Sequence, residues 1–325
     1  REGRQRVLLK GPSGDLRFSP VKVPEKAMLG AAATETLHAR LLEDAESGGF
    51  AMSLGILAGV PSTQIENTCK ALLYAHHHDG NDVALLKALI AHEVEACTNA
   101  EAIFRTNTAA TLTFKYMSKM VGLDYLFATL GKVLRDVMQK DADDAAVEEQ
   151  VRKNKDKGMA ELMVVQDTFE VDPTKVAESG DVGQDDVLSI NTLQLTLLVQ
   201  RFMKQIFQSA ERMPAELRDV LAEVRDDVAD KYPEAVQRAL GAFVFLRFYN
   251  CGIAVPEAYG LLEEPPNERL RRTLVLATKV LTTMSSGARF GEKEEFMTQF
   301  NELLDSNQEA LNAFQQSILS AGSEV

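Results

Sequence analysis

The chain has 325 residues, of which 45% are hydrophobic and 26% charged, the balance of a soluble globular protein with a sizeable core. A formal net charge of −13 argues against nonspecific binding of the whole domain to nucleic acid or to an anionic membrane surface. No apolar run approaches the roughly 20 residues needed to cross a bilayer, and no apolar segment of a signal peptide follows residues 1–4.

The aromatic and cysteine contents further limit the fold class and the cellular compartment that the sequence indicates. The chain has no tryptophan and only 6% aromatic residues, which favours a helical protein over a β-sandwich. Its three cysteines are odd in number and far apart, so we expect reduced thiols in a cytosolic protein and no disulfide framework.

Residues 1–24 differ from the rest of the chain. A turn signal at residues 11–14 is followed by alternation of Leu16 and Phe18 with polar neighbours, and Pro20 and Pro24 end the stretch. We interpret residues 1–24 as a strand-like tail of an upstream module or as a tether, with an ordered extension of no function as an equal alternative. Residues 25–325 are expected to form one helical domain.

Helical signals recur after Pro24. Capping-box spacing at Thr63–Glu66 and again at Thr98–Glu101 predicts two helix starts. Pro233 fits the first turn of a later helix. Apolar residues at helical spacing predict an amphipathic face behind the first cap and two further helices: Ile65, Cys69, Leu72 and Leu73; Leu193, Leu197 and Phe202; and Phe296, Phe300, Leu303 and Leu304.

Two polar stretches are predicted to be loops. The first joins an acidic run at residues 141–149 to a basic run at residues 152–157, for which a solvated helix face is the simpler interpretation. The second covers residues 179–184.

Three adjacent histidines, at residues 76–78, are the most conspicuous donor group. Neighbouring residues on a helix point in different directions, so they cannot share a metal ion without an irregular backbone. Adding His92 and Cys97 gives no recognisable zinc spacing. We therefore expect the end of a surface helix before the turn at Asp79 and Gly80, and no metal site.

Two arginines stand in unusual surroundings, whereas the common nucleotide-binding and hydrolase motifs are missing. Arg105 precedes Thr106 and a stretch that can cap a helix, so it is expected at a tight corner between two helices. Arg247 lies in an apolar run at residues 241–250, where a guanidinium is costly to bury unless its donors find acceptors. Either arginine alone is most often solvated and inert.

Several segments, in order along residues 35–320, resemble the catalytic domain of Ras GTPase-activating proteins (RasGAP), of the neurofibromin-like kind. Residues 103–111 (IFRTNTAAT) are similar to the arginine-finger block, and residues 119–126 (KMVGLDYL) continue it. Residues 169–175 (FEVDPTK), 245–256 (FLRFYNCGIAVP), 274–281 (LVLATKVL) and 290–307 are similar to later blocks of the family.

The resemblance implies an all-α RasGAP-type fold, with a central catalytic subdomain carrying both arginines and a smaller helical subdomain from flanking segments. It implies that Arg105 is an arginine finger inserted in trans toward GTP on a Ras-family GTPase, and that Arg247 holds the finger loop. Thr106, Leu246, Asn250 and Lys279 are implied to contact the partner.

The same resemblance implies that the domain binds no cofactor or metal of its own, because the partner GTPase holds GTP and Mg²⁺. It also implies a monomeric, cytoplasmic activator, not an enzyme by itself, that acts at the inner face of the plasma membrane and regulates Ras signalling negatively. The target GTPase stays open.

Four positions depart from the family pattern. Cys251 follows the signature asparagine in place of proline, Ala109 replaces a leucine, Leu112 a lysine and Thr282 a glutamine. These changes remove neither arginine, but they bear on docking strength. Two alternatives remain: a scaffold of the IQGAP type, which binds small GTPases without activating them and lacks the finger, and a helical interaction domain with no GTPase partner.

Overall fold

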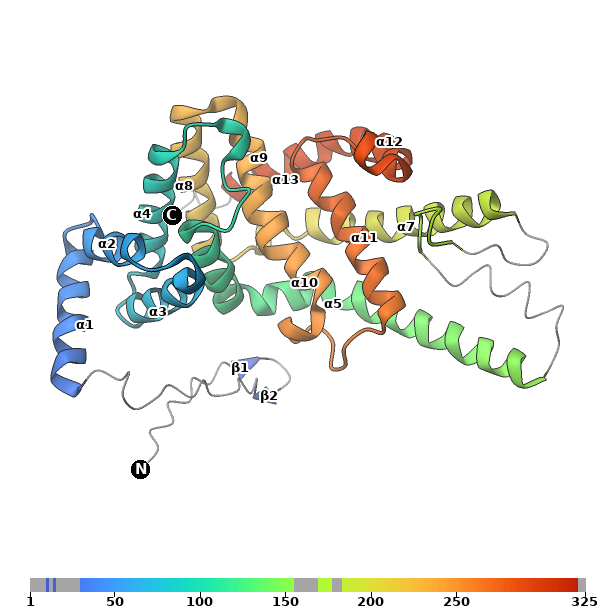
Figure 1. The fold of residues 1–325 in the computed structure, drawn as a ribbon, viewed down its shortest axis with the longest axis horizontal. Helices are drawn as coiled ribbons and strands as arrows, with labels where there is room; N and C mark the ends of the chain where they lie inside the picture. The colour runs from blue at the N-terminus through green and yellow to red at the C-terminus, as the bar shows by residue number, and fades with distance from the viewer. Residues whose placement is uncertain (1–9, 12–13, 16–29, 155–168, 177–182, 321–325) are drawn as a thin grey trace. The chain divides into compact units, whose positions relative to one another are not determined.

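The computed structural model describes residues 10–11, 14–15, 30–154, 169–176 and 183–320. Apart from two-residue strands, their regular structure is helical, which confirms the expected all-α class (Figure 1). The helices are α1 (Ala31–Glu46), α2 (Ala51–Gly59), α3 (Ile65–His78), α4 (Asp82–Ala96), α5 (Ala109–Asn154), α7 (Gln184–Phe207), α8 (Ala215–Lys231), α9 (Val236–Gly241), α10 (Asn250–Ala254), α11 (Glu268–Ser285), α12 (Asn301–Ser306) and α13 (Gln308–Ser320).

Shorter elements join these helices. Element η6 (Ala242–Tyr249) is a π-helix. The 3₁₀ segments are η2 (Ser62–Gln64), η3 (Ala100–Ala102), η4 (Ala210–Arg212), η5 (Pro233–Ala235), η7 (Pro256–Tyr259) and η8 (Glu292–Phe300). The strands β1 (Lys10–Gly11) and β2 (Gly14–Asp15) pair antiparallel across the expected turn. Leu16 and Phe18 lie outside the described residues, and the role of residues 1–24 stays a prediction.

The chain forms two compact units, each made of two segments. Unit 1 comprises Arg1–Asp124 and Pro214–Ala239, and unit 2 comprises Tyr125–Met213 and Leu240–Val325. Helix α5 begins in one unit and ends in the other. This division differs from the expected one, because Arg105 falls in unit 1 and Arg247 in unit 2.

Packing of α4 along α8 forms much of the core of unit 1 (Figure 1). Both helices carry apolar residues at intervals of three or four, so each presents one continuous apolar face. The buried members of this interface are Leu85, Leu86, Leu89 and Ile90 on α4, and Leu217, Val220, Leu221, Val224 and Val228 on α8.

An aromatic cluster around η6 forms the core of unit 2. Phe245 and Tyr249 each contact Phe314 of α13, at ring-centroid distances of 6.2 and 6.4 Å. Tyr125 stacks on Phe248 at 6.0 Å and bonds through its hydroxyl to Ser209 at 2.6 Å, so the buried phenol has a polar partner.

Gly241 explains how η6 approaches α11 so closely. A Cβ atom at this position would lie 2.1 Å from the carbonyl oxygen of Ser285, which is backbone and cannot move aside. The absence of a side chain therefore allows the π-helix to begin directly against α11. Segments of π-helix are often found at functional sites.

Several predictions about individual helices and about the cysteines agree with the structure. Helix α3 buries Cys69, Leu72 and Leu73 as expected and ends at His78 before the predicted turn. Pro233 opens η5 at its first turn. Phe300, Leu303 and Leu304 are buried across η8 and α12. The three cysteines are free thiols.

Other predictions are wrong in detail. Asn99, not Thr98, caps η3, with its side chain accepting from the amide of Glu101 at 2.9 Å, and no side-chain cap forms at the start of α3. Leu193 and Leu197 are 59% and 52% exposed, whereas Phe202 is fully buried. Nine residues separate Leu193 from Phe202, which places them on opposite sides of a helix that turns about 100° per residue.

Residues 141–154 are helical, because α5 continues through the acidic run, so the simpler interpretation as part of a helix holds as far as Asn154 and the loop does not. Eight of the 14 residues at positions 141–154 are alanine, glutamate, glutamine, arginine or lysine, which are strong helix formers. The basic residues 155–157, like most of the loop predicted at residues 179–184, lie outside the described residues. Among the described helices, none combines the length and apolar character needed to span a bilayer.

Half-buried Asp227 on α8 provides a test of electrostatics in unit 1. Burial, together with the neighbouring carboxylates Glu223, Asp226 and Asp230, raises the pKa of Asp227 to about 6. Its folded-state pKa then exceeds its unfolded value, so Asp227 opposes folding as the pH rises from about 4 through 6.

We expect Asp227→Asn to raise the melting temperature at pH 7.5, by a stabilisation on the order of 1 kcal/mol after solvent screening. The gain should shrink as the pH falls through 6 and vanish near pH 4. Asp226→Asn is the matched control, because pairing with Arg225 lowers the pKa of Asp226. Equal effects of the two substitutions on thermal unfolding across this range would contradict the assignment.

Candidate functional site

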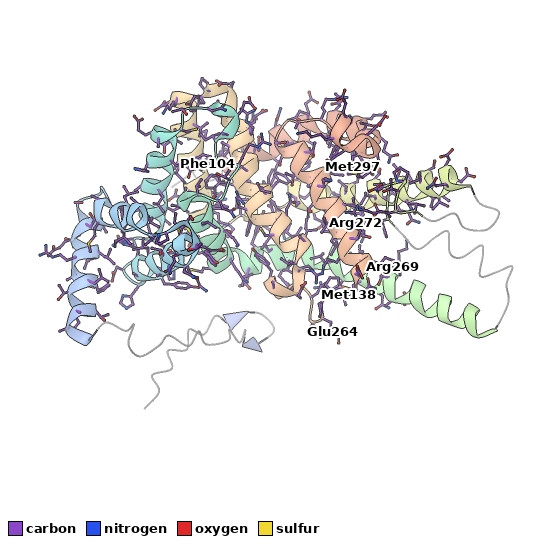
Figure 2. All side chains as sticks on the ribbon, viewed as in Figure 1. Phe104, Met138, Glu264, Arg269, Arg272 and Met297 are labelled. Carbon is purple, nitrogen blue, oxygen red and sulfur yellow. The ribbon has the colours of Figure 1, made fainter. Side chains whose placement is uncertain are left out.

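Arg105 projects from a sharp corner in unit 1, formed by residues 103–108 between η3 and α5. Ile103 and Phe104 are each only 1% exposed, whereas Arg105 is exposed. Phe104, which is labelled in Figure 2, lies in this corner. Its φ of 55° is a left-handed conformation that is rare for a bulky residue. Burial of two large apolar side chains stabilises this backbone, and the turn leaves Arg105 directed to solvent.

Thr111 closes the corner from the first turn of α5. Its hydroxyl oxygen accepts from the amide of Thr108 at 2.8 Å and lies 3.1 Å from the carbonyl oxygen of Thr106, to which it can donate. In return, the hydroxyl of Thr108 accepts from the amide of Thr111 at 3.3 Å. Thr106 therefore takes part in the corner through its main-chain carbonyl group. Thr111, which is 1% exposed, was not identified from the sequence.

The segment that leads into the corner is held by side chains from the other part of unit 1. Lys231 donates to the carbonyl oxygens of Val94 and Glu95, at 3.0 and 2.6 Å. The hydroxyl of Tyr232 donates to the carbonyl oxygen of Cys97 at 2.8 Å. These bonds fix the end of α4 from a segment more than 130 residues away in sequence.

Arg238 holds η3 itself, the element immediately before the corner. It donates to the carbonyl oxygen of Ala100 at 3.3 Å and forms an ion pair with Glu101 at 3.2 Å. No local sequence pattern distinguishes Arg238 from a surface arginine, so its contact with η3 was found only from the structure.

Leu246 and Arg247 are the half-buried residues of η6, whose other side chains are buried. The π-helix thus leaves this pair of side chains partly exposed. The expectation that Arg247 is partly buried agrees with this position. The finger loop at residues 103–108, on which the resemblance implies that Arg247 acts, belongs to unit 1.

Asn250, assigned from the sequence to partner contact, has an internal role in the structure. It is 5% exposed, and its side-chain amide donates to the hydroxyl of Thr282 at 2.7 Å and to the carbonyl oxygen of Thr278 at 3.3 Å. The amide therefore joins α10 to α11. Thr282, one of the departures from the family pattern, is the residue that accepts this bond.

Lys279 lies on α11 with 37% of its side chain exposed. Its ammonium group forms an ion pair with Glu294 of η8 and lies 5.8 Å from the centroid of the Phe296 ring. Val275, one turn earlier, is 41% exposed. This stretch of α11 therefore presents a lysine and an apolar side chain at the surface of unit 2.

Glu170 fastens the loop at residues 169–176 to α11. Arg272 donates to both of its carboxylate oxygens, at 2.7 and 3.1 Å, and Arg272 projects from α11 in Figure 2. Burial alone would raise the pKa of Glu170, but the Arg272 guanidinium and the amide of Asp172 outweigh it and hold the pKa below its usual value. The carboxylate thus stays charged and fixes the loop.

The candidate residues form two groups. Arg105 and Thr106 belong to the corner of unit 1, whereas Leu246, Arg247, Asn250 and Lys279 lie on η6, α10 and α11 of unit 2. Neither group contains a nucleophile beside a base. Among the described residues, the one group with metal-ligand geometry is formed by His38, His78 and Asp79, outside both groups. The described cations of the two groups are Arg105 in unit 1, and Arg247 and Lys279 in unit 2.

Comparison with known proteins yields one matching family. The model of the family described as GTPase-activator protein for Ras-like GTPase matches residues 85–286, a range that includes every candidate residue above.

Individual relatives agree with this match. The probable Ras GTPase-activating-like protein ngap of Dictyostelium discoideum is 27% identical over 262 residues, which cover 79% of this chain and 26% of the relative. The Disabled homolog 2-interacting protein of Mus musculus is 29% identical, over 74% of this chain and 18% of the relative. Neurofibromin-A of Dictyostelium discoideum is 28% identical, over 82% of this chain and 28% of the relative. The chain thus spans between 18% and 28% of the length of these proteins.

The contact between Arg238 and η3 predicts a local change in backbone protection. Arg238→Met keeps the aliphatic part of the side chain but removes its donors, so we expect amides at residues 99–106 to exchange with deuterium about fivefold faster, as suits the loss of about 1 kcal/mol. Arg225→Met, which removes an arginine paired with its neighbour Asp226, is the control. Unchanged exchange at residues 99–106 would show that Arg238 does not hold this segment.

Proposed function

Because the chain belongs to the family of GTPase-activator proteins for Ras-like GTPases, we propose that it accelerates GTP hydrolysis on a Ras-family partner by inserting Arg105 into the partner's nucleotide site. The observation that carries the proposal is the Arg105 corner. An exposed arginine follows two buried residues on a backbone fixed by Thr111, so its guanidinium extends from a rigid base.

The chemistry of phosphoryl transfer explains the use of arginine. Charge on the β–γ bridging and γ oxygens must be stabilised as the bond to the γ-phosphate breaks. A guanidinium is permanently charged and planar, and it can direct two donors to neighbouring oxygens. The partner supplies GTP, Mg²⁺ and the water-orienting glutamine, and this chain supplies the arginine. Acceleration of hydrolysis would require no cofactor held by this domain.

The remaining residues divide into positioning and docking roles. In the proposal, Arg247 acts on the finger loop through hydrogen bonds to its backbone and is a positioning residue. Leu246 and Lys279 contact the partner, and Asn250 keeps α10 and α11 together behind them. The domain would act as a monomer on a GTP-bound GTPase at the inner face of the plasma membrane, lowering Ras signalling.

Removal of Arg105 tests the proposal directly. Since the finger acts on charge that develops during reaction, Arg105→Ala should reduce kcat far more than affinity. For Ras and its activators, the standard case of this effect, the finger is worth about 10³–10⁵ in rate. We expect binding to GTP-loaded Ras within about tenfold of wild type and a loss of at least 10²–10³ in single-turnover hydrolysis.

Two further variants sharpen this experiment. Arg105→Lys should restore little activity, because an ammonium group lacks the planar fork. Arg40→Ala, which removes an exposed arginine of α1, is the matched control and should leave hydrolysis unchanged. If Arg105→Ala accelerated hydrolysis as well as wild type, the finger would be refuted. A chain that binds GTP-loaded Ras yet leaves hydrolysis unchanged would behave as an IQGAP-like scaffold.

Lys279 provides a test of docking that is separate from chemistry. Loss of one interfacial charge contact costs about 1–3 kcal/mol of binding, so Lys279→Met should raise KM roughly tenfold and leave kcat at saturation nearly unchanged. The difference from wild type should shrink as salt rises, because salt screens the lost attraction. Lys204→Met, at an exposed lysine of α7, is the control. Equal KM values for wild type and Lys279→Met would exclude Lys279 from docking.

A further inference from the structure

Three potential metal ligands converge in unit 1 where α1 meets the end of α3. His38 lies on α1, His78 is the last residue of α3, and Asp79 follows it. His38 Nε2 is 2.7 Å from Asp79 Oδ2, and His78 Nδ1 is 3.1 Å from Asp79 Oδ1. One donor atom from each residue lies within 4.8 Å of the other two. We propose that this triad binds a divalent transition-metal ion of the zinc type.

The donor set suits such an ion. Neutral imidazole nitrogens with a carboxylate oxygen favour zinc and its neighbours in the first transition row over calcium or magnesium. Zinc binds these donors at about 2.0–2.2 Å, so tetrahedral ligands lie about 3.3 Å apart. To reach this spacing, the present separations of 2.7 and 3.1 Å would widen by about 0.6 and 0.2 Å, and the two imidazole nitrogens, which lie within 4.8 Å of each other, would adjust to about 3.3 Å. His38 and His78, which are 43% and 80% exposed, have room for this movement.

Asp79 is the fixed member of the triad. Its side chain is 17% exposed, and its amide donates to the carbonyl oxygen of His76 at 3.2 Å. The next amide, of Gly80, donates to the carbonyl oxygen of His77, and Gly80 has a φ of 73° that favours glycine. The turn therefore holds the carboxylate in place, while both imidazoles point their nitrogens at its two oxygens.

His38 is the potential ligand that was not considered when the sequence predicted no metal site. The adjacent histidines cannot chelate an ion together, and the structure gives the other two separate partners. His76 is 1% exposed, not on the surface as predicted, and bonds to Ser53 at 3.0 Å. His77 bonds to Asp82 at 2.6 Å. His78 alone faces Asp79 and His38, and His38 lies 40 residues earlier in the chain.

A bound ion would join α1 to the α3–α4 turn. Three protein ligands leave at least one position for water, as in open zinc sites. The ion would replace imidazole protons as the link to the carboxylate, so binding would fix α1 against α3 more firmly than the hydrogen bonds alone.

Binding of Zn²⁺ and Co²⁺ to the chelator-treated 325-residue chain tests this site. Isothermal titration with Zn²⁺ should give one saturable site in the micromolar range, and Zn²⁺ should raise the melting temperature in proportion to the logarithm of its concentration. Loss of a partner outside the coordination shell already costs 10–100-fold in affinity, so His38→Ala and His78→Ala should each weaken binding at least about tenfold. His92→Ala, at an exposed histidine of α4, should bind as wild type does.

Co²⁺ serves as a spectroscopic probe of the ligands. Visible absorption without a sulfur charge-transfer band, lost in His38→Ala, supports nitrogen and oxygen ligation by the triad. A sulfur band would place the ion on a cysteine and overturn the proposal. Absence of saturable Zn²⁺ binding to the wild type, or equal binding by all three histidine variants, would overturn it as well. Circular dichroism checks folding, and alanine at an exposed helical position such as His38 should preserve the helix.

Discussion

The position of Arg105 depends on the burial of the two residues before it. A left-handed φ at a bulky residue such as Phe104 costs about 1–3 kcal/mol. Burial of a phenylalanine or isoleucine side chain contributes about 1.5–3 kcal/mol each, so Ile103 and Phe104 together offset that strain. Because the strained turn is fixed by core packing, the next side chain must leave the core. Its direction is therefore set before any partner is present.

Helix α11 has the corresponding role in unit 2. Three neighbouring segments are attached to it by polar contacts: the loop at residues 169–176 through Arg272, η8 through Lys279, and α10 through Thr278 and Thr282. The close approach of η6 at Gly241 adds a fourth contact through backbone packing. A displacement of α11 would thus move Leu246 and Lys279 together, so the proposed docking surface would move as one element.

The sequence predicted the helical class, the family and the corner at Arg105, because these depend on local patterns and on recognisable segments. It could not predict contacts that depend on tertiary packing. Arg238 and Tyr232 donate to carbonyl groups more than 130 residues away. Every residue has a backbone carbonyl group, so the sequence does not indicate which of them accepts from a distant side chain. The resemblance assigned Asn250 to partner contact, yet its side-chain amide donates to Thr282. Leu193 was assigned to the core by spacing alone, although nine residues separate it from Phe202.

The two cations of the proposed interface, Lys279 and Arg105, would contribute to it in different ways. With a net charge of −13, the chain repels an acidic partner at long range, so attraction must come from individual cations at short range. Lys279 already has an anionic partner in Glu294, and docking on an acidic surface would exchange one carboxylate for another. Its net contribution to binding is then the difference between the ion pair formed with the partner and the ion pair given up with Glu294. In the proposal Arg105 differs, because the charge it would stabilise grows during the reaction itself. An interaction that strengthens only in the transition state increases the rate without requiring tight binding beforehand. A domain with weak, exchangeable docking contacts and one rigidly placed guanidinium can therefore release its partner readily after hydrolysis and still accelerate the reaction.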